Sequence, residues 1–283
     1  MHTVLIDGIA TRYQVIGSGD PLLMYAPGGF DATLEKWSTQ GVYAKIKPVD
    51  HLSRHYSCII FDRRECGQSG GRVEKVGLAS YVKQGLGLLD HLKIDKAHLM
   101  GGCMGCCPVA AFGVMHPERV RSMVLFWPVG GAKYRLSSQQ RFADHLAFVR
   151  ANGLQAVVDL VKADGKAFNA DSRGGPWASV LKHDAKFAAD YVQQDVGRYA
   201  LIVEAFGRTM FDRDTAPSAE PEELLACQVP ALVVPGHDAA HATSAAWYLH
   251  ECLPKSEFWN VPVSEQTEEA TNPVLLDFLK KAA

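Results

Sequence analysis

The sequence predicts an α/β fold with a mostly parallel, eight-stranded sheet, helices on both of its faces and an inserted helical layer. Three observations support this prediction. Short apolar runs alternate with helical patterns through the first half of the chain, as in a parallel sheet with right-handed crossovers. Only helical patterns follow from about residue 130 to residue 227, and the strand pattern then resumes. Functional residues of such a fold are expected at the carboxyl ends of the strands.

The strands of the first half are expected at short apolar runs, each followed by a loop that contains Gly or Pro. Asp7–Gly8 separates the first two runs and is typical of a hairpin turn. Apolar residues at helical spacing from Val82 to Leu92 predict a crossover helix. The expected strands are Thr3–Ile6, Arg12–Ile16, Leu22–Ala26, Cys58–Phe61, Ala97–Met100 and Ser122–Trp127.

The inserted helical layer is expected to cover the sheet as a cap, because the core pattern returns after it. Its predicted helices are Gln139–Ala151, Leu154–Ala163 and Ala185–Phe206. The core then continues with two strands and a final amphipathic helix, at Ala231–Pro235, Glu257–Val261 and Pro273–Lys281. The predicted organisation is therefore a core of residues 1–129 and 228–283 with a cap of residues 130–227.

The composition favours a cytoplasmic protein with a small-molecule partner. The chain has 283 residues, of which 47% are hydrophobic, so it can bury a large core. Its 29 Lys and Arg against 31 Asp and Glu, without a basic run, predict no surface for nucleic acid or for a membrane. The amino terminus lacks the pattern of a secretion signal, and no apolar run has the length of a membrane span. The seven cysteines, an odd number, indicate reduced thiols. Composition leaves open whether the chain forms a homo-oligomer.

The segment around Cys103 is the most informative in the chain. A predicted strand runs through Leu99–Met100, Gly101 and Gly105 lie two residues to either side of Cys103, and a helix is expected to follow. A nucleophile on a sharp strand-to-helix turn requires small residues at both positions. The start of the helix would also favour the thiolate form of the cysteine. Two other interpretations are a buried structural cysteine and a redox or metal pair with Cys106.

This Gly-x-Cys-x-Gly motif resembles the nucleophile elbow of the α/β-hydrolase family, and the resemblance covers nearly the whole chain. Ala26–Phe30 is similar to the loop in which the family places an oxyanion-hole amide. Asp62–Ser69 resembles the family's D-x-R-G-x-G-x-S loop, with Glu65 in place of a usual glycine. The resemblance implies an α/β-hydrolase fold that needs no cofactor and no metal. It also implies an oxyanion hole formed by backbone amides of Met104 and of Gly29 or Phe30.

The acid and base of the family are only partly matched. Asp238 follows the predicted seventh strand, where the family places its acid, but no histidine follows residue 250, after which the base is expected. We therefore expect His241, three residues beyond Asp238 on the same loop, to act as the base, with His237 as a weaker candidate. Alternatively, Glu265 or Ser264 takes the vacated place beside an already acidic thiol, or the site binds a ligand without reacting.

The resemblance implies a cofactor-independent hydrolase that cleaves an ester, thioester, lactone or activated C–C bond through an acyl-cysteine intermediate at Cys103. One alternative is an acyltransferase that uses the same cysteine. Another, suggested by the missing late histidine, is a catalytically silent ligand-binding protein. The sequence does not reveal whether Cys103 is natural or replaces a serine. The small acyl substrate is expected against apolar side chains, among them Trp127, Trp177 and Phe206. Cap arginines that could anchor a carboxylate are Arg173, Arg208 and Arg213.

Overall fold

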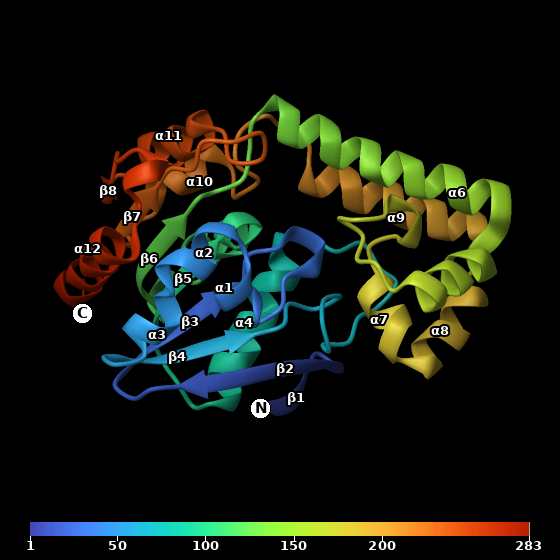
Figure 1. The fold of residues 1–283 in the computed structure, drawn as a ribbon, viewed down its shortest axis with the longest axis horizontal. Coiled ribbons are helices and arrows are strands. Elements are labelled where there is room, and N and C mark those ends of the chain that lie inside the picture. The colour runs from blue at the N-terminus through green and yellow to red at the C-terminus, as the bar shows by residue number, and fades with distance from the viewer. Residues whose placement is uncertain (283) are drawn as a thin grey trace.

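The computed structural model describes residues 1–282, which form an α/β core and a group of helices beyond one end of its sheet (Figure 1). The sheet has eight strands in the order β1-β2-β4-β3-β5-β6-β7-β8. The β1–β2 and β2–β4 pairs are antiparallel, and all the other pairs are parallel. The strands are His2–Ile6, Ile9–Ile16, Asp20–Tyr25, Tyr56–Phe61, Ala97–Gly102, Val120–Phe126, Ala231–Val234 and Ser256–Phe258, numbered β1 to β8. The predicted mostly parallel eight-stranded sheet is confirmed.

Both faces of the sheet are covered by helices, which explains why its central strands read as continuous apolar runs. Successive residues of β3 point to opposite faces, so that Leu23 and Tyr25 join one buried cluster and Leu22 and Met24 join the other. One face packs against α4 and α5, and the opposite face packs against α2, α3 and α12. These helices are Leu78–His91 (α4), Cys106–Met115 (α5), Gly41–Ile46 (α2), Pro48–Leu52 (α3) and Glu268–Lys281 (α12).

The parallel register brings the carboxyl ends of four strands to one edge of the sheet. Tyr25 of β3 pairs with Gly101 of β5, and Phe126 of β6 pairs with Gly102 and with Val234 of β7. The loops that follow these strands therefore lie side by side. They contain Cys103, Asp238 and His241 and the predicted oxyanion amides, whereas the alternatives Glu265 and Ser264 follow β8.

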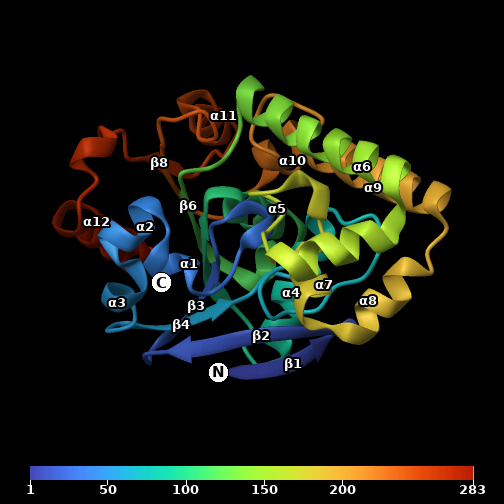
Figure 2. The ribbon, with the colours of Figure 1, turned by 45° about the vertical axis from the view of Figure 1, so that its right-hand side comes forward.

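Four helices lie beyond this edge, where Figures 1 and 2 show them past the arrowheads of β3 and β4. We call residues 132–210 the helical insertion. It consists mainly of α6 (Ala132–Asp164), α7 (Ala178–His183), α8 (Ala185–Val192) and α9 (Val196–Met210). The next helix, α10 (Pro221–Ala226), packs against α5 and α11 (Thr243–Cys252) of the core. The sequence assigned residues 221–226 to the cap, and in the structure their helix contacts these core helices.

The insertion differs from its prediction in two other ways. Helix α6 begins at Ala132, earlier than predicted, and Gly153 breaks its backbone with a φ of +77° near the predicted gap. The single helix expected at Ala185–Phe206 is two helices, because the Asp195 carboxylate accepts a hydrogen bond from the Arg198 amide and starts α9 there. None of the described helices is both long and apolar enough to cross a membrane.

Candidate active site

Cys103 lies on a sharp turn between β5 and α5. Its φ is +55°, in the left-handed region that residues other than glycine rarely adopt. A Cβ atom on Gly101 would lie 2.4 Å from the carbonyl oxygen of Gly105, and one on Gly105 would lie 2.3 Å from that of Tyr25. The turn therefore requires glycine at both positions, as the sequence pattern indicates. Strained backbone of this kind is characteristic of functional sites.

His241 and Asp238 form a hydrogen-bonded pair on the loop after β7. The Nδ1 atom of His241 lies 2.9 Å from each carboxylate oxygen of Asp238. The same carboxylate accepts hydrogen bonds from the backbone amides of Ala240 and His241, at 2.8 and 2.9 Å, which fixes the loop. A β-bridge between His241 and Gly130 ties the loop to the segment that leads into the insertion. These contacts leave Nε2 as the free end of the imidazole.

The free end of His241 interacts with the Cys103 thiol. Nε2 is buried and makes no hydrogen bond of standard geometry with the described residues, but the Cys103 thiol is near enough for each group to shift the pKa of the other. Burial acts to lower the pKa of His241, but the hydrogen bonds and charges of Cys103 and Asp238 outweigh it and raise this pKa to about 9. Burial acts to raise the pKa of Cys103, but His241 and the amides of Gly28 and Met104 outweigh it and lower this pKa. The two shifts together favour a thiolate–imidazolium pair.

The loop after β3 brings a backbone amide to the Cys103 thiol. The Gly28 amide reaches the Cys103 sulfur, as does that of Met104, whereas the Phe30 amide donates to the Oδ1 atom of Asn169 at 3.4 Å. The assignment of the oxyanion-hole amides to Met104 and to Gly29 or Phe30 stays a prediction, and the Gly28 amide is a further candidate.

Two side chains that the sequence analysis missed hold this loop. Asn169, from the insertion, donates from Nδ2 to the Gly28 carbonyl at 2.5 Å, and Arg63, from the loop after β4, donates to the Gly29 carbonyl. Arg63 lies inside the D-x-R motif, so the motif could have indicated that this residue has a role at the site. Asn169 lies between helices without any recognisable pattern, and nothing in the sequence indicates its role.

Gln266 follows β8, the strand after which the resemblance would place the late histidine, and it bonds to Trp127. Gln266 is buried, and its Oε1 accepts a hydrogen bond from Nε1 of Trp127 at 2.6 Å. Its Nε2 donates to the carbonyls of Pro235 and Val261, at 2.9 and 3.0 Å. The Trp127 ring centroid lies 5.4 Å from that of His241. This pair therefore forms a wall beside the imidazole.

The other candidates for the base point elsewhere. Glu265 and Ser264 are exposed. His237 is also exposed, and its Nδ1 lies 3.2 Å from the hydroxyl of Thr243. A surface groove of about 780 Å³ runs along this outer side and is lined by His237, Thr243 and residues 260–264. Cys103 is not among its lining residues, so this groove is separate from the space in front of the thiol.

Cys106 has a structural environment. Its thiol donates to the carbonyl oxygens of Gly101 and Phe126, at 3.1 and 3.4 Å. Burial raises the pKa of Cys106 well above its usual value. All seven cysteines are free thiols, and the described residues contain no group of three or more potential metal ligands. These contacts do not support the Cys103–Cys106 pair that the spacing left open.

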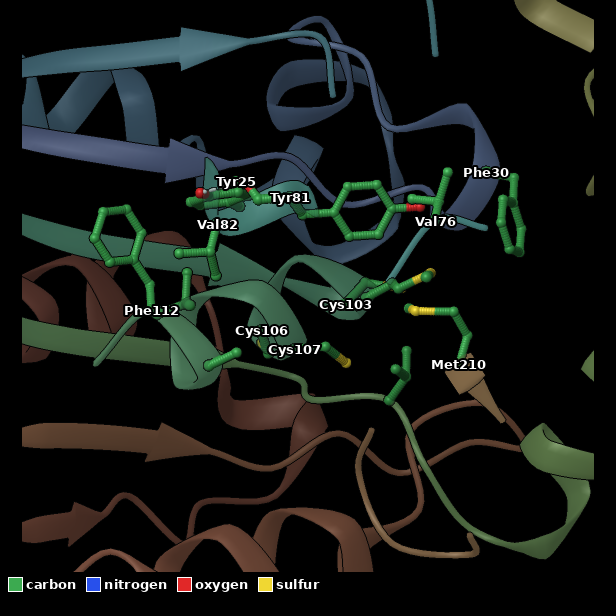
Figure 3. Packing of buried hydrophobic residues seen from close by; sticks show 14 of the residues in the cluster. Tyr25, Phe30, Val76, Tyr81, Val82, Cys103, Cys106, Cys107, Phe112 and Met210 are labelled. Atoms are coloured by element: carbon green, nitrogen blue, oxygen red, sulfur yellow. Dashed lines mark hydrogen bonds between the residues drawn. The ribbon is translucent and has the colours of Figure 1, made fainter. Parts of the chain in front are cut away.

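An aromatic wall faces the elbow. Figure 3 shows the Cys103 side chain directed to the side on which Phe30 and Met210 lie. Phe30 is in contact with four rings of the insertion and its exit, with centroids 5.2 to 6.2 Å away: Phe142, Phe168, Phe206 and Phe211. Of the predicted substrate contacts, Phe206 belongs to this wall and Trp127 stands beside His241. Trp177 lies behind Phe206, fully buried, and its Nε1 donates to the Arg72 carbonyl at 2.9 Å.

In sequence, the chain resembles known proteins over part of its length. Residues 21–157 match a family model described as alpha/beta hydrolase fold. The chain is 30% identical over 162 residues to the dihydrolipoyllysine-residue acetyltransferase component of an acetoin cleaving system from Cupriavidus necator, over 56% of this chain and 40% of that protein. It is 32% identical over 130 residues to a 2-hydroxy-6-oxo-2,4-heptadienoate hydrolase from Pseudomonas putida, over 45% and 44%. The chain thus spans less than half the length of these curated relatives.

In fold, the likeness extends over nearly all of the chain. An enol-lactonase from Burkholderia xenovorans superposes with a TM-score of 0.62 at 21% identity, over 99% of this chain and 100% of that one. A meta-cleavage product hydrolase from Pseudomonas fluorescens superposes with a TM-score of 0.61 at 16% identity, over 100% and 98%. At these identities the likeness establishes the fold.

Proposed function

We propose that this chain, which has the α/β-hydrolase fold and whose residues 21–157 match that family's model, hydrolyses acyl-type substrates through Cys103. The substrate classes are esters, thioesters, lactones and activated C–C bonds. The observation that carries the proposal is the strained turn of Cys103 beside His241, whose imidazole is bonded to Asp238 through Nδ1. The opposite pKa shifts of Cys103 and His241 agree with this arrangement. A structural cysteine has no need of such a partner.

In the proposed acylation step, the Cys103 thiolate attacks the substrate carbonyl and the carbonyl oxygen becomes negative. The amides of Gly28 and Met104, which reach the sulfur in the free enzyme, are placed to donate to that oxygen. Protonated His241 then gives its Nε2 proton to the leaving group, which departs and leaves an acyl-cysteine. Asp238 keeps the imidazole oriented and stabilises its positive charge.

In the proposed deacylation step, neutral His241 takes a proton from water as the water attacks the thioester. The carboxylic acid is released and Cys103 leaves as the thiolate, which restores the starting ion pair. An amine, alcohol or thiol acceptor would follow the same path and make the protein an acyltransferase. The similarity to a protein named as an acetyltransferase component favours this second candidate. The Cys103–His241 interaction supports either reaction over a ligand-binding protein without catalysis.

The proposal is tested by hydrolysis of p-nitrophenyl butyrate by the wild type and by Cys103→Ala, with Cys252→Ala as control. Cys252 is a buried cysteine at the end of α11, away from the elbow. We expect Cys103→Ala to lose at least about 1,000-fold in rate, which is the scale of removing a nucleophile, and Cys252→Ala to keep the wild-type rate. Undiminished turnover by Cys103→Ala would rule out the nucleophile. Product analysis with added alcohols or amines distinguishes hydrolysis from acyl transfer.

A further inference from the structure

The inner face of α6 carries three polar side chains that the proposed mechanism does not use. Tyr134, Ser138 and Arg141 are spaced by four and three residues, so they project from one face of the helix. Ser138 is 1% exposed, and its hydroxyl has no hydrogen-bond partner among the described residues. The Arg141 guanidinium lies over the ring of Phe168, 5.9 Å from its centroid. Within residues 1–282, no carboxylate pairs with it.

Arg63 presents a second unneutralised charge, from the core. It is 2% exposed, and its Nε and Nη1 atoms have no partner among the described residues. Its third nitrogen holds the Gly29 carbonyl, and its guanidinium lies 4.4 Å from the centroid of the Tyr81 ring. The neighbouring Glu65 carboxylate pairs with Arg64 instead, at 2.9 Å. Burying an unpaired charge costs several kcal/mol, so a buried guanidinium of this kind is normally found with an anion.

Both sets of groups lie next to the same cluster of aromatic rings. Phe30, which follows Gly29, packs against Phe168 at 5.2 Å and against Phe211 at 6.2 Å. Arg141 lies over the first of these rings, and the Tyr134 ring packs against the second at 5.6 Å. Burial raises the pKa of Tyr134, the Cys103 charge raises it further, and the charges of Arg63 and Arg141 act in the opposite direction. The Tyr134 hydroxyl therefore lies within the electrostatic reach of the thiol and of both guanidinium groups.

We propose that Arg141, Ser138 and Tyr134, with Arg63 behind the oxyanion loop, form a subsite for a carboxylate on the acyl part of the substrate. This inference rests on the proposed function and narrows it to acyl compounds with a second, anionic end. A carboxylate would accept hydrogen bonds from the Arg141 guanidinium and from the two hydroxyl groups, while the Arg63 charge attracts it. Of the arginines predicted for this role, Arg173 pairs with Asp171 and Arg213 with Asp212, and Arg208 is exposed.

The test compares two esters with the same leaving group, mono-p-nitrophenyl glutarate and neutral p-nitrophenyl butyrate. We expect the wild type to prefer the glutarate ester in kcat/KM. Arg141→Met should reduce that preference about 10- to 100-fold, the range for a lost charge-assisted hydrogen bond, and leave butyrate hydrolysis within about twofold. Arg150→Met is the matched control, because Arg150 is an exposed residue of the same helix and pairs with Glu204 on the surface.

A binding measurement separates this inference from the proposed function. Glutarate should raise the melting temperature of the Cys103→Ala protein, and the additional Arg141→Met change should remove that shift. An equal preference for the two esters in the wild type and in Arg141→Met, or no stabilisation by glutarate, would overturn the subsite while Cys103-dependent butyrate hydrolysis continued. Loss of the proposed function has a different signature, in which neither ester is hydrolysed although glutarate still binds.

Discussion

Cys103 depends on its neighbours at the scale of single residues. Its sulfur is held between His241 and two backbone amides, and each of these groups stabilises the thiolate against the cost of burial. The sequence predicted His241 because a histidine three residues after Asp238 can share its loop and its hydrogen bond. It did not predict Asn169, because a side chain that supports a loop through a backbone carbonyl leaves no pattern of spacing, and it passed over Arg63 although this residue lies inside the D-x-R motif.

The pH dependence of Cys103 alkylation by iodoacetamide tests the ion pair. The lowered pKa of Cys103 means that its thiolate persists to lower pH than that of an ordinary thiol, whose pKa is about 8.5. In His241→Gln, the imidazolium no longer offsets the effect of burial on the Cys103 pKa. The midpoint of the alkylation profile should therefore move to higher pH, and the alkylation rate at pH 7 should fall about 10-fold or more. Turnover, unlike alkylation, should decline above about pH 9, where His241 loses its proton.

The control for this experiment is Glu265→Gln, because Glu265 is exposed. Its alkylation profile should match that of the wild type. If Glu265→Gln shifted the midpoint of the alkylation profile and His241→Gln did not, the Glu265 carboxylate would be the base.

At the scale of elements, the strands were predicted well and the helices less well. Central strands are buried on both faces, so their apolar runs are distinct in the sequence. Strand β8 is shorter than predicted, and the backbone amide of Trp259 beyond its end still bonds to the carbonyl of Val233. The short helices before β4 and the start of α6 carry no strong periodicity. Their boundaries are set by tertiary packing, which sequence periodicity does not report.

The elbow gives the sharpest prediction at this scale. Gly105→Ala would place a Cβ 2.3 Å from the Tyr25 carbonyl oxygen, so backbone must move. We expect a loss of about 2–3 kcal/mol in unfolding free energy, as for overpacking, together with loss of activity. Gly197→Ala, inside helix α9 with its nearest contact at 3.3 Å, should be neutral or stabilising by up to about 1 kcal/mol. Urea unfolding of both variants measures these changes in unfolding free energy. Equal losses in Gly105→Ala and Gly197→Ala would contradict the steric explanation.

At the scale of the whole molecule, the site is formed where the helical insertion meets the core. Asn169 bonds to the oxyanion loop, and Trp177 bonds to the carbonyl of Arg72 in the loop after β4. The sequence predicted an insertion between two core strands because the strand pattern stops and returns. It could not indicate that α10 packs on helices of the core, because α10 is helical like the insertion and this packing has no local signature.

The central claim is that catalysis passes through an acyl group on Cys103. Its most direct measurement is intact-protein mass spectrometry of enzyme quenched in acid during turnover of p-nitrophenyl butyrate, followed by peptide mapping. We expect a fraction of the wild type to carry one butyryl group on the peptide that contains Cys103, as a thioester that hydroxylamine removes. His241→Gln should accumulate more of this species if its deacylation slows further than its acylation. Turnover with a butyryl group on any other residue, and none on Cys103, would contradict the account.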